Sequence, residues 1–281
     1  MTDELSITDE DFQKFREFFY RKTGIQFEDT KRYFVDKRLI ERMQATRMPT
    51  FRSYFTLLRF QASGEELQTL TNAMTVNETY FFREDYQFKC LVNSLLPEIV
   101  GRKKQGDTLR IWSIPSSSGE EPYSIALYLM EFWSGIAQWD VELIASDIDT
   151  EILRRARLGK FSERSVQHLP QRLLQRHFRR MSDGEYQISD DLRQSVEFTR
   201  VNLSDPAETR PYRGFDVIFC RNLLIYFDDL SRREAAEVFY DALNPGGFIC
   251  LGHSESMSRI TSLFRVRKFP DAIVYQKPEA R

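Results

Sequence analysis

Hydrophobic residues recur at helical spacing in the first hundred residues and then gather into short apolar runs separated by helical stretches. A first helix is predicted between Thr8, which resembles an N-cap, and Gly24, which favours a helix end. Its apolar stripe consists of Phe12, Phe15, Phe18 and Phe19. Further helices are expected from Asp29, over 51–60 and after Gly64. Because this part of the chain carries no strand signal, we predict an N-terminal helical domain over 1–85.

From Thr108 onward, apolar runs typical of strands alternate with helical stretches. Strands are expected over 109–112, 141–146, 195–200, 215–220, 247–251, 264–268 and 272–276. Helices are expected over 122–133, 151–158 and 231–243. This alternation predicts a doubly wound α/β domain over 86–281, with a mostly parallel sheet and an antiparallel edge hairpin from the last two strands. A short hairpin near 160–191 interrupts the alternation and indicates an inserted β-subdomain.

Composition adds broad limits to this picture. The 281 residues are enough for a sizeable core, and a formal net charge of −2 points to neither nucleic acid nor membrane. Three cysteines are too few for a disulfide framework. The first residues lack the features of a signal peptide, and no apolar stretch approaches the ~18 residues of a spanning helix. We therefore expect the protein in the cytoplasm, and we expect it to be a monomer.

The loop between the first expected strand and the helix after it carries the strongest chemical signal. Small residues over 113–119 let a ligand approach the backbone closely, as in nucleotide-binding crossovers. Glu120 and Glu121 then stand at a helix N-terminus, where phosphate would normally bind. The two carboxylates disfavour a pyrophosphate and suit a cationic cofactor without phosphate. S-adenosylmethionine, with its sulfonium and ammonium, is such a cofactor.

Polar residues follow other expected strands at the edge of the sheet where ligands bind. Asp147 is placed to accept both ribose hydroxyls, because Asp149 is the better cap for the next helix. Asn202 and Leu203 either read an adenine edge or form a turn, and the sequence favours neither. Arg221 and Asn222 follow a strand directly, and we interpret both as ligand-binding.

Other polar and aromatic residues have plain structural interpretations. Residues 77–84 read as a core-packing linker, and Tyr226 stands in an apolar run that is typical of a core. Arg38 and Arg42 share one helix face, which is either solvated or a docking surface for an acidic partner. The three histidines lack metal-ligand spacing, so we expect no metal site.

Five motifs in order resemble the bacterial chemotaxis receptor methyltransferases, the CheR family. The motifs cover 77–84, 112–123, 145–149, 215–227 and 244–252. The resemblance extends over nearly the whole chain. It implies a class I methyltransferase fold and methyl transfer from S-adenosylmethionine to glutamate side chains of chemoreceptors, with S-adenosylhomocysteine as the product.

The resemblance also implies residue roles, and it replaces the structural interpretations of 77–84 and Tyr226. The cofactor-binding positions that it implies are Asn77, Thr79, Arg83, Glu121, Asp147, Asn202, Leu203, Arg221 and Asn222. Arg83 is further implied to steer the substrate carboxylate, and Tyr226 to be catalytic. Arg38 and Arg42 would face the acidic methylation region of the receptor.

Two departures and two rival interpretations remain. Ile114 and Pro115 stand where the family usually has small residues, which puts a backbone contact there in doubt. The hairpin over 180–185 lacks a glycine-rich loop, so we expect no dependence on a receptor's C-terminal peptide tether. The rivals are a nucleotide-dependent oxidoreductase and a non-catalytic module that senses the cofactor.

Overall fold

The computed structural model describes residues 6–279 and begins with a domain of four α-helices. These helices are α1 (Asp9–Thr23), α2 (Arg32–Ala45), α3 (Phe51–Phe60) and α4 (Glu65–Met74), with a short turn η1 (Asp29–Lys31) before α2. Thr8 and Asp11 form a capping box at the start of α1, and Gly24 ends this helix with a φ of 72°. The helical prediction for this segment is therefore confirmed.

The second domain opens with a helical run that the sequence analysis did not foresee, made of α5 (Tyr86–Cys90), a π-helical turn η2 (Leu91–Leu95) and α6 (Leu96–Val100). Its main strands are β1 (Thr108–Ser113), β2 (Asp140–Asp147), β6 (Glu197–Arg200), β7 (Phe215–Cys220), β8 (Leu243–Leu251), β9 (Arg265–Lys268) and β10 (Ile273–Gln276). Its main helices are α7 (Glu120–Phe132), α8 (Thr150–Leu158) and α13 (Asp229–Ala242). A shorter helix, α12 (Pro206–Thr209), follows β6.

The seven strands form one sheet in the order β6-β2-β1-β7-β8-β10-β9. The first five are parallel, whereas β10 runs antiparallel to both β8 and β9. The predicted doubly wound class I methyltransferase fold and its edge hairpin are confirmed. Because the chain leaves β1 toward β2 and later returns to its other side at β7, the carboxyl end of β1 is a topological switch point, where such sheets bind ligands.

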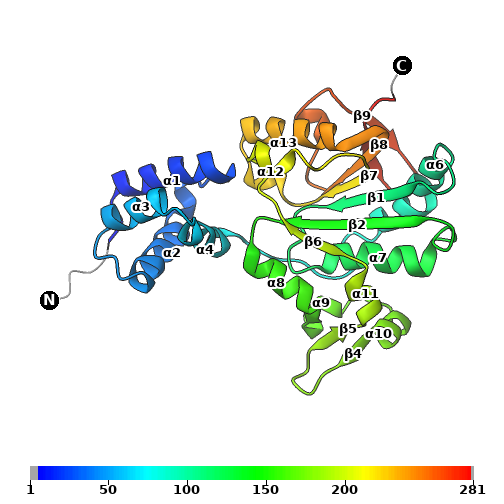
Figure 1. The fold of residues 1–281 in the computed structure, drawn as a ribbon, viewed down its shortest axis with the longest axis horizontal. Helices are drawn as coiled ribbons and strands as arrows, with labels where there is room; N and C mark the ends of the chain where they lie inside the picture. Colours follow the sequence, from blue (N-terminus) through cyan, green and yellow to red (C-terminus); the bar gives the residue numbers. More distant parts are fainter. Residues whose placement is uncertain (1–5, 280–281) are drawn as a thin grey trace.

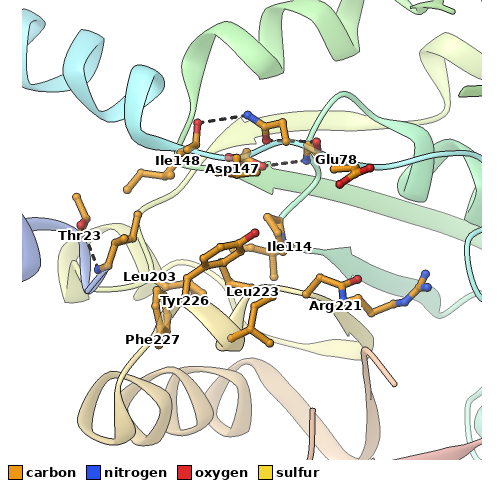
Figure 2. Close-up of a pocket in the computed structure, with 18 of the residues that line it drawn as sticks. Thr23, Glu78, Ile114, Asp147, Ile148, Leu203, Arg221, Leu223, Tyr226 and Phe227 are labelled. Atoms are coloured by element: carbon orange, nitrogen blue, oxygen red, sulfur yellow. Dashed lines mark hydrogen bonds between the residues drawn. The ribbon is translucent and has the colours of Figure 1, made fainter. Parts of the chain in front are cut away.

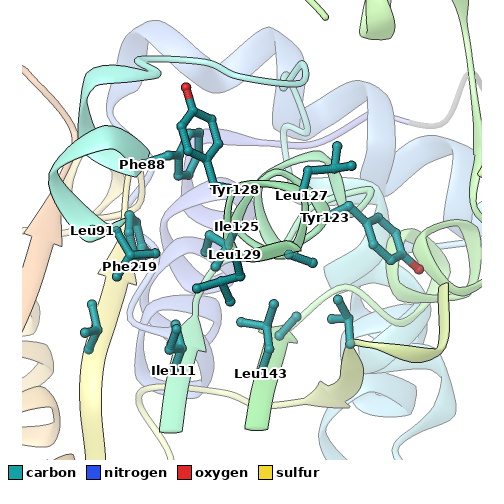
Figure 3. Close-up of a cluster of buried hydrophobic side chains, with 14 of the residues drawn as sticks. Phe88, Leu91, Ile111, Tyr123, Ile125, Leu127, Tyr128, Leu129, Leu143 and Phe219 are labelled. Carbon is teal, nitrogen blue, oxygen red and sulfur yellow. The ribbon is translucent and has the colours of Figure 1, made fainter. Parts of the chain in front are cut away.

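Both faces of the sheet are covered by helices. On one face, α5–α6 and α7 pack on Ile111, Leu143 and Phe219, as Figure 3 shows. On the other face, Trp112 and Ile218 pack with Phe239 of α13. Successive residues of one strand point to opposite faces, so Ile111 and Trp112 of β1 and Ile218 and Phe219 of β7 contribute to both cores.

The expected inserted subdomain is present as a separate small sheet. Its strands are β3 (Lys160–Phe161), β4 (Phe178–Arg180) and β5 (Tyr186–Ile188), in the antiparallel order β3-β5-β4. Three short helices accompany it, namely α9 (Glu163–Val166), α10 (Gln171–His177) and α11 (Asp190–Gln194). The Phe81 ring packs edge-on against Phe161 and Phe178, with centroids 4.8 and 5.2 Å away, and so joins the subdomain to the main core.

Packing divides the two domains between Met74 and Phe81. Met74 belongs to the core of the helical domain and Phe81 to the core of the sheet domain, which is earlier than the division at 85 that we expected. The helical domain lies beside one end of the sheet (Figure 1). Asn72 of α4 donates to Thr150 at 2.9 Å, and Tyr20 of α1 donates to Asp228 at 2.9 Å.

Candidate functional site

A cavity of about 830 Å³ lies between the helical domain and the carboxyl ends of β1, β2, β6 and β7. Its walls include residues from the end of α1, from the segment between the domains and from the loops after these strands. Figure 2 shows Asp147 on one side of this space and Tyr226 on the other. The cavity therefore opens at the switch point of the sheet, where the topology predicts a ligand.

The small-residue loop after β1 turns sharply into α7. The Ser116 amide donates to the Ser146 carbonyl at 2.7 Å, and Ser117 has a positive φ of 47°. Gly119 caps α7 with a φ of 100°, and a Cβ on it would lie 2.9 Å from the ring of Tyr123. Only a residue without a side chain suits this close approach. The peptide bond between Ile114 and Pro115 is cis.

Asp149 takes the capping role that its position before the helix predicted, and Asp147 lies at the cavity wall. Asp149 caps α8 by accepting from the amides of Glu151 and Ile152, both at 2.9 Å. Asp147 is buried at the cavity wall and accepts from the amides of Ser117 and Asp149 at 2.9 and 3.0 Å. Burial raises the pKa of Asp147 to about 6, although the two amides oppose this shift.

The two carboxylates at the start of α7 point in different directions. Glu120 is buried away from the cavity and accepts from Ser118 at 2.6 Å and from Ser165 of the inserted subdomain at 2.7 Å. Glu121 lines the cavity and accepts from Ser113 at 2.8 Å. Burial raises the pKa of Glu121, against the opposing charge of Arg221. Only Glu121 of this pair therefore lines the cavity.

Arg221 joins three segments beneath the cavity. Its guanidinium lies 3.0 Å from the Glu121 carboxylate and 3.2 Å from that of Glu84, and it donates to the Arg83 carbonyl at 2.6 Å. The side chain is almost completely buried. Its charge is thus held within the protein, and its contacts fix both the start of α7 and the segment that carries Arg83. No role for Glu84 was predicted from the sequence.

Tyr226 stands in η3 (Leu224–Tyr226) on the loop between β7 and α13. It is 41% exposed and lines the cavity, so its interpretation as a core residue from the apolar run is wrong. The apolar run Leu223–Phe227 suggested that Tyr226 is buried. In the structure, Leu224 and Phe227 take the buried positions, and the 3₁₀ turn directs Tyr226 outward. Asn222 lines the same wall and has a positive φ of 58°.

The segment between the domains serves both packing and the cavity. Phe81 is fully buried, as the core-linker interpretation required, whereas Asn77, Thr79 and Arg83 line the cavity. The Asn77 side chain donates to Asp149 at 3.0 Å, which ties the segment to the start of α8. Arg83 donates to the Glu78 carbonyl at 3.0 Å and makes no ion pair within the described range 6–279.

Asn202 and Leu203 line the cavity just after β6, and both are buried. The Asn202 side chain already bonds to protein on both sides, because it accepts from the Ser204 amide at 3.0 Å and donates to the Lys22 carbonyl at 2.6 Å. Asn202 thus forms a turn, one of the two roles that the sequence allowed for it. It also holds the end of α1 in place. Gly24 lies close by, where a Cβ would meet the Ser204 hydroxyl.

Arg38 and Arg42, predicted to lie on a solvated face or a docking surface, both make contacts inside the helical domain. Arg42 forms a two-bond pair with the buried carboxylate of Glu66, at 2.9 and 2.7 Å. Arg38 donates to the Ala73 carbonyl at 2.5 Å and stacks on the Phe34 ring. Helical spacing correctly placed the two arginines on one face, but that face packs against α4.

No group of three or more His, Cys, Asp or Glu side chains within 6–279 is arranged to hold a metal ion. Over the same range, no helix is both long and apolar enough to cross a membrane.

Comparison with known proteins agrees with this geometry. Two family models match in series, the CheR methyltransferase all-alpha domain over 10–75 and the CheR methyltransferase SAM binding domain over 77–273. Chemotaxis protein methyltransferase 2 of Vibrio cholerae is 59% identical over 275 residues, which are 98% of this chain and 95% of the relative. The Escherichia coli chemotaxis protein methyltransferase is 36% identical over 270 residues, 95% and 91% of the two chains.

The models divide the chain where its cores divide, and most of the residues that line the cavity belong to the matched SAM binding domain, with most of the remainder from the all-alpha domain. S-adenosylmethionine is therefore the cofactor, as the acidic helix start predicted. The match covers both domains and almost every described residue. This chain belongs to the CheR methyltransferase family.

Proposed function

We propose that this protein methylates glutamate side chains in the cytoplasmic domains of chemoreceptors, forming glutamyl methyl esters. The names of its relatives support a chemotaxis substrate. One observation carries the choice of a carboxylate: the Arg83 guanidinium at the cavity wall has no carboxylate partner among residues 6–279. An incoming glutamate side chain would supply that partner.

The lining of the cavity fits S-adenosylmethionine. An ionised carboxylate has about four lone-pair positions, and two at Asp147 are taken by backbone amides, which leaves two for the hydroxyls of a ribose. Glu121 offers a carboxylate for the ammonium. We assign the rest of the binding wall to Asn77, Thr79, Arg83, Asn202, Leu203, Arg221 and Asn222. Leu203 would pack on the adenine, and Arg221 would act by holding Glu121.

The residues of this chain position the reaction rather than perform proton chemistry. When bound, S-adenosylmethionine supplies an activated methyl group and leaves as S-adenosylhomocysteine. A glutamate carboxylate is already ionised at pH 7, so it needs no general base. Arg83 would orient the substrate carboxylate by two parallel hydrogen bonds. The Tyr226 hydroxyl would contact the same carboxylate from the other side. Such positioning can supply roughly 7–11 kcal/mol of the barrier.

The receptor would approach over the open side of the cavity. Lys31 of η1 and Tyr226 both line the cavity, and Lys31 is exposed and makes no ion pair in the described chain. An acidic methylation region would find this cation beside the cavity, while Arg38 and Arg42 support the helix behind it. The turn between β4 and β5 is tight, with the Met181 amide bonded to the Glu185 carbonyl at 2.7 Å. We propose a monomer that acts in the cytoplasm without a peptide tether.

The decisive experiment measures transfer of labelled methyl from S-adenosylmethionine to purified receptor cytoplasmic fragments. Peptide mass spectrometry should place the label on glutamate as a base-labile ester. Arg83→Ala should reduce kcat/KM by roughly 100-fold, as expected for a lost positioning contact, while S-adenosylhomocysteine binding shows whether the variant still folds around its cofactor. Cofactor binding without transfer to any receptor fragment would favour the non-catalytic sensor. Binding of NAD instead would favour the oxidoreductase.

A further inference from the structure

Glu255 gathers three backbone amides around a single carboxylate. Its Oε2 accepts from the amides of Asn222 and Gly252, both at 2.9 Å, and its Oε1 accepts from the amide of Leu224 at 2.8 Å. Three charge-assisted hydrogen bonds from backbone to one side chain make a strong and directional anchor. Glu255 does not itself line the cavity.

The anchored loop is the one that carries Asn222 and Tyr226 to the cavity. Asn222 has a positive φ of 58°, a conformation that costs free energy in a residue with a side chain unless its surroundings hold it. The Leu224 amide that binds Glu255 lies at the start of η3, and Tyr226 is the last residue of the same turn. Glu255 thus binds the backbone at both ends of the segment Asn222–Leu224, which precedes Tyr226.

The chain after β8 is shaped for this contact. A Cβ on Gly252 would lie 2.9 Å from Glu255 Oε2 and 3.1 Å from the Asn222 side-chain nitrogen. The Glu255 amide donates to the Gly252 carbonyl at 2.9 Å, which closes a turn and returns the carboxylate toward β7. The loops after two neighbouring parallel strands are therefore joined through one side chain.

We propose that Glu255 is a positioning residue for methyl transfer, which sets the place of Tyr226 and of the Asn222 backbone through their amides. The proposal rests on the proposed roles of Tyr226 and Asn222. The Leu224 contact governs Tyr226 and the Asn222 contact governs the cofactor wall, so the two carboxylate oxygens have separable effects.

Glutamine tests this separation because it keeps one acceptor oxygen and replaces the other with a donor. In Glu255→Gln, we expect the side-chain oxygen to accept from the two amides that converge, those of Asn222 and Gly252. The side-chain NH₂ group then faces the Leu224 amide, and two donors cannot bond to each other. We expect kcat to fall roughly 10- to 100-fold from misplacement of Tyr226. The Kd for S-adenosylhomocysteine should change less than about threefold. Glu255→Ala leaves all three amides without this acceptor. It should lower both kcat and the affinity for S-adenosylhomocysteine.

The control is Glu237→Gln, because Glu237 is exposed on α13 and makes no hydrogen bond or ion pair within residues 6–279. This variant should match the parent protein in kcat, in KM for the receptor and in cofactor affinity. Thermal unfolding of each variant, measured with and without S-adenosylhomocysteine, shows whether a loss of activity reflects a smaller folded fraction.

A double-mutant cycle with Tyr226→Phe separates positioning from general stability. If Glu255 acts through Tyr226, Glu255→Gln should reduce kcat much less in the Tyr226→Phe background than in the parent protein. Equal factors in both backgrounds, or loss of cofactor affinity without loss of kcat, would overturn the proposal. An unchanged kcat for Tyr226→Phe alone would instead remove the proposed role of Tyr226, so the two failures are distinguishable.

Discussion

The Arg221 guanidinium and the Glu121 carboxylate lie 3.0 Å apart beneath the cofactor cavity, although 100 residues separate them in the chain. Glu121 is the second residue of α7 and Arg221 follows β7, so this pair joins the two elements that flank the topological switch point. Both side chains are nearly buried, which means that each charge depends on the other. These two residues at the cavity therefore form an ion pair with each other and do not present two free charges to a ligand.

Removal of Arg221 should therefore destabilise the protein strongly. In Arg221→Gln, the buried carboxylate of Glu121 loses its cation. The carboxylate of Glu84 loses the same cation and keeps its contact with His253 at 3.1 Å. We therefore expect the unfolding free energy to fall by about 3–5 kcal/mol. Urea unfolding followed by circular dichroism measures this loss. Arg233→Gln is the control, because Arg233 is exposed on α13 without an ion pair in the described chain. A loss below ~1 kcal/mol would contradict the buried-pair account.

Cofactor affinity should depend on pH through Asp147. Its pKa in the free protein is raised to about 6 by burial, so the carboxylate is mostly ionised at pH 7 and mostly protonated at pH 5. Because two ribose hydroxyls require acceptors, affinity for S-adenosylhomocysteine should fall about tenfold from pH 7 to pH 5. Titration calorimetry across this range measures the change.

Asp147→Asn is the matched variant for this titration. It should bind about 1.5–3 kcal/mol more weakly at pH 7, from loss of charge-assisted hydrogen bonds. It should also lose most of the dependence between pH 7 and pH 5. A residual dependence would point to Glu121, whose pKa is raised by burial as well. A flat profile in the parent protein would exclude the assignment of Asp147 to the ribose.

Periodicity predicted most of the fold because the chain uses regular elements with clear ends. The predicted bounds of α3 and β7 match the structure, and Asp149 caps α8 as its position before the helix suggested. The run α5–α6 was missed because it is a series of short pieces, a five-residue helix, a π turn and a helix with Pro97 near its start. Such a run has no uniform 3.6-residue period to detect.

The site was harder to predict because side-chain direction and long-range partners are absent from local patterns. Asp147 and Glu121, which both line the cavity, were predicted from their places at the end of a strand and the start of a helix. Glu255 was missed because its partners, the amides of Asn222 and Leu224, lie more than thirty residues earlier. Arg42 was misjudged because nothing near it in sequence shows that Glu66 lies opposite.

Arg42 should act on the stability of the helical domain rather than on receptor binding. Arg42→Ala leaves the Glu66 carboxylate buried with only the Tyr54 hydroxyl, which donates to it at 2.8 Å. We expect a loss of about 2–3 kcal/mol, below the range for fully buried pairs because Arg42 is a quarter exposed. Lys37→Ala is the control, since Lys37 and Glu41 are 4.0 Å apart and both mostly exposed. A stable Arg42→Ala protein with raised receptor KM would restore the docking interpretation.

Asn202 offers a direct choice between a structural and a ligand-binding role. Its side-chain nitrogen donates to the Lys22 carbonyl and its oxygen accepts from the Ser204 amide. Asn202→Asp keeps the second contact but turns a carboxylate oxygen toward the Lys22 carbonyl. If the role is structural, unfolding free energy should fall by about 1–3 kcal/mol, and the Kd for S-adenosylhomocysteine should stay nearly constant.

Asn72→Asp is the matched comparison for this choice. Asn72 also bonds across the two domains, to the hydroxyl and amide of Thr150, but it does not line the cavity. Both variants replace a donor with an acceptor at an interdomain contact, so a structural Asn202 should give a similar loss of stability and a similarly unchanged Kd. If Asn202 also reads the adenine edge, its variant alone should weaken cofactor binding by about tenfold or more, since a buried polar contact is then lost with the ligand. Comparing the two Kd ratios after matching folded fractions separates the roles, because any general loosening of the domain interface affects both variants.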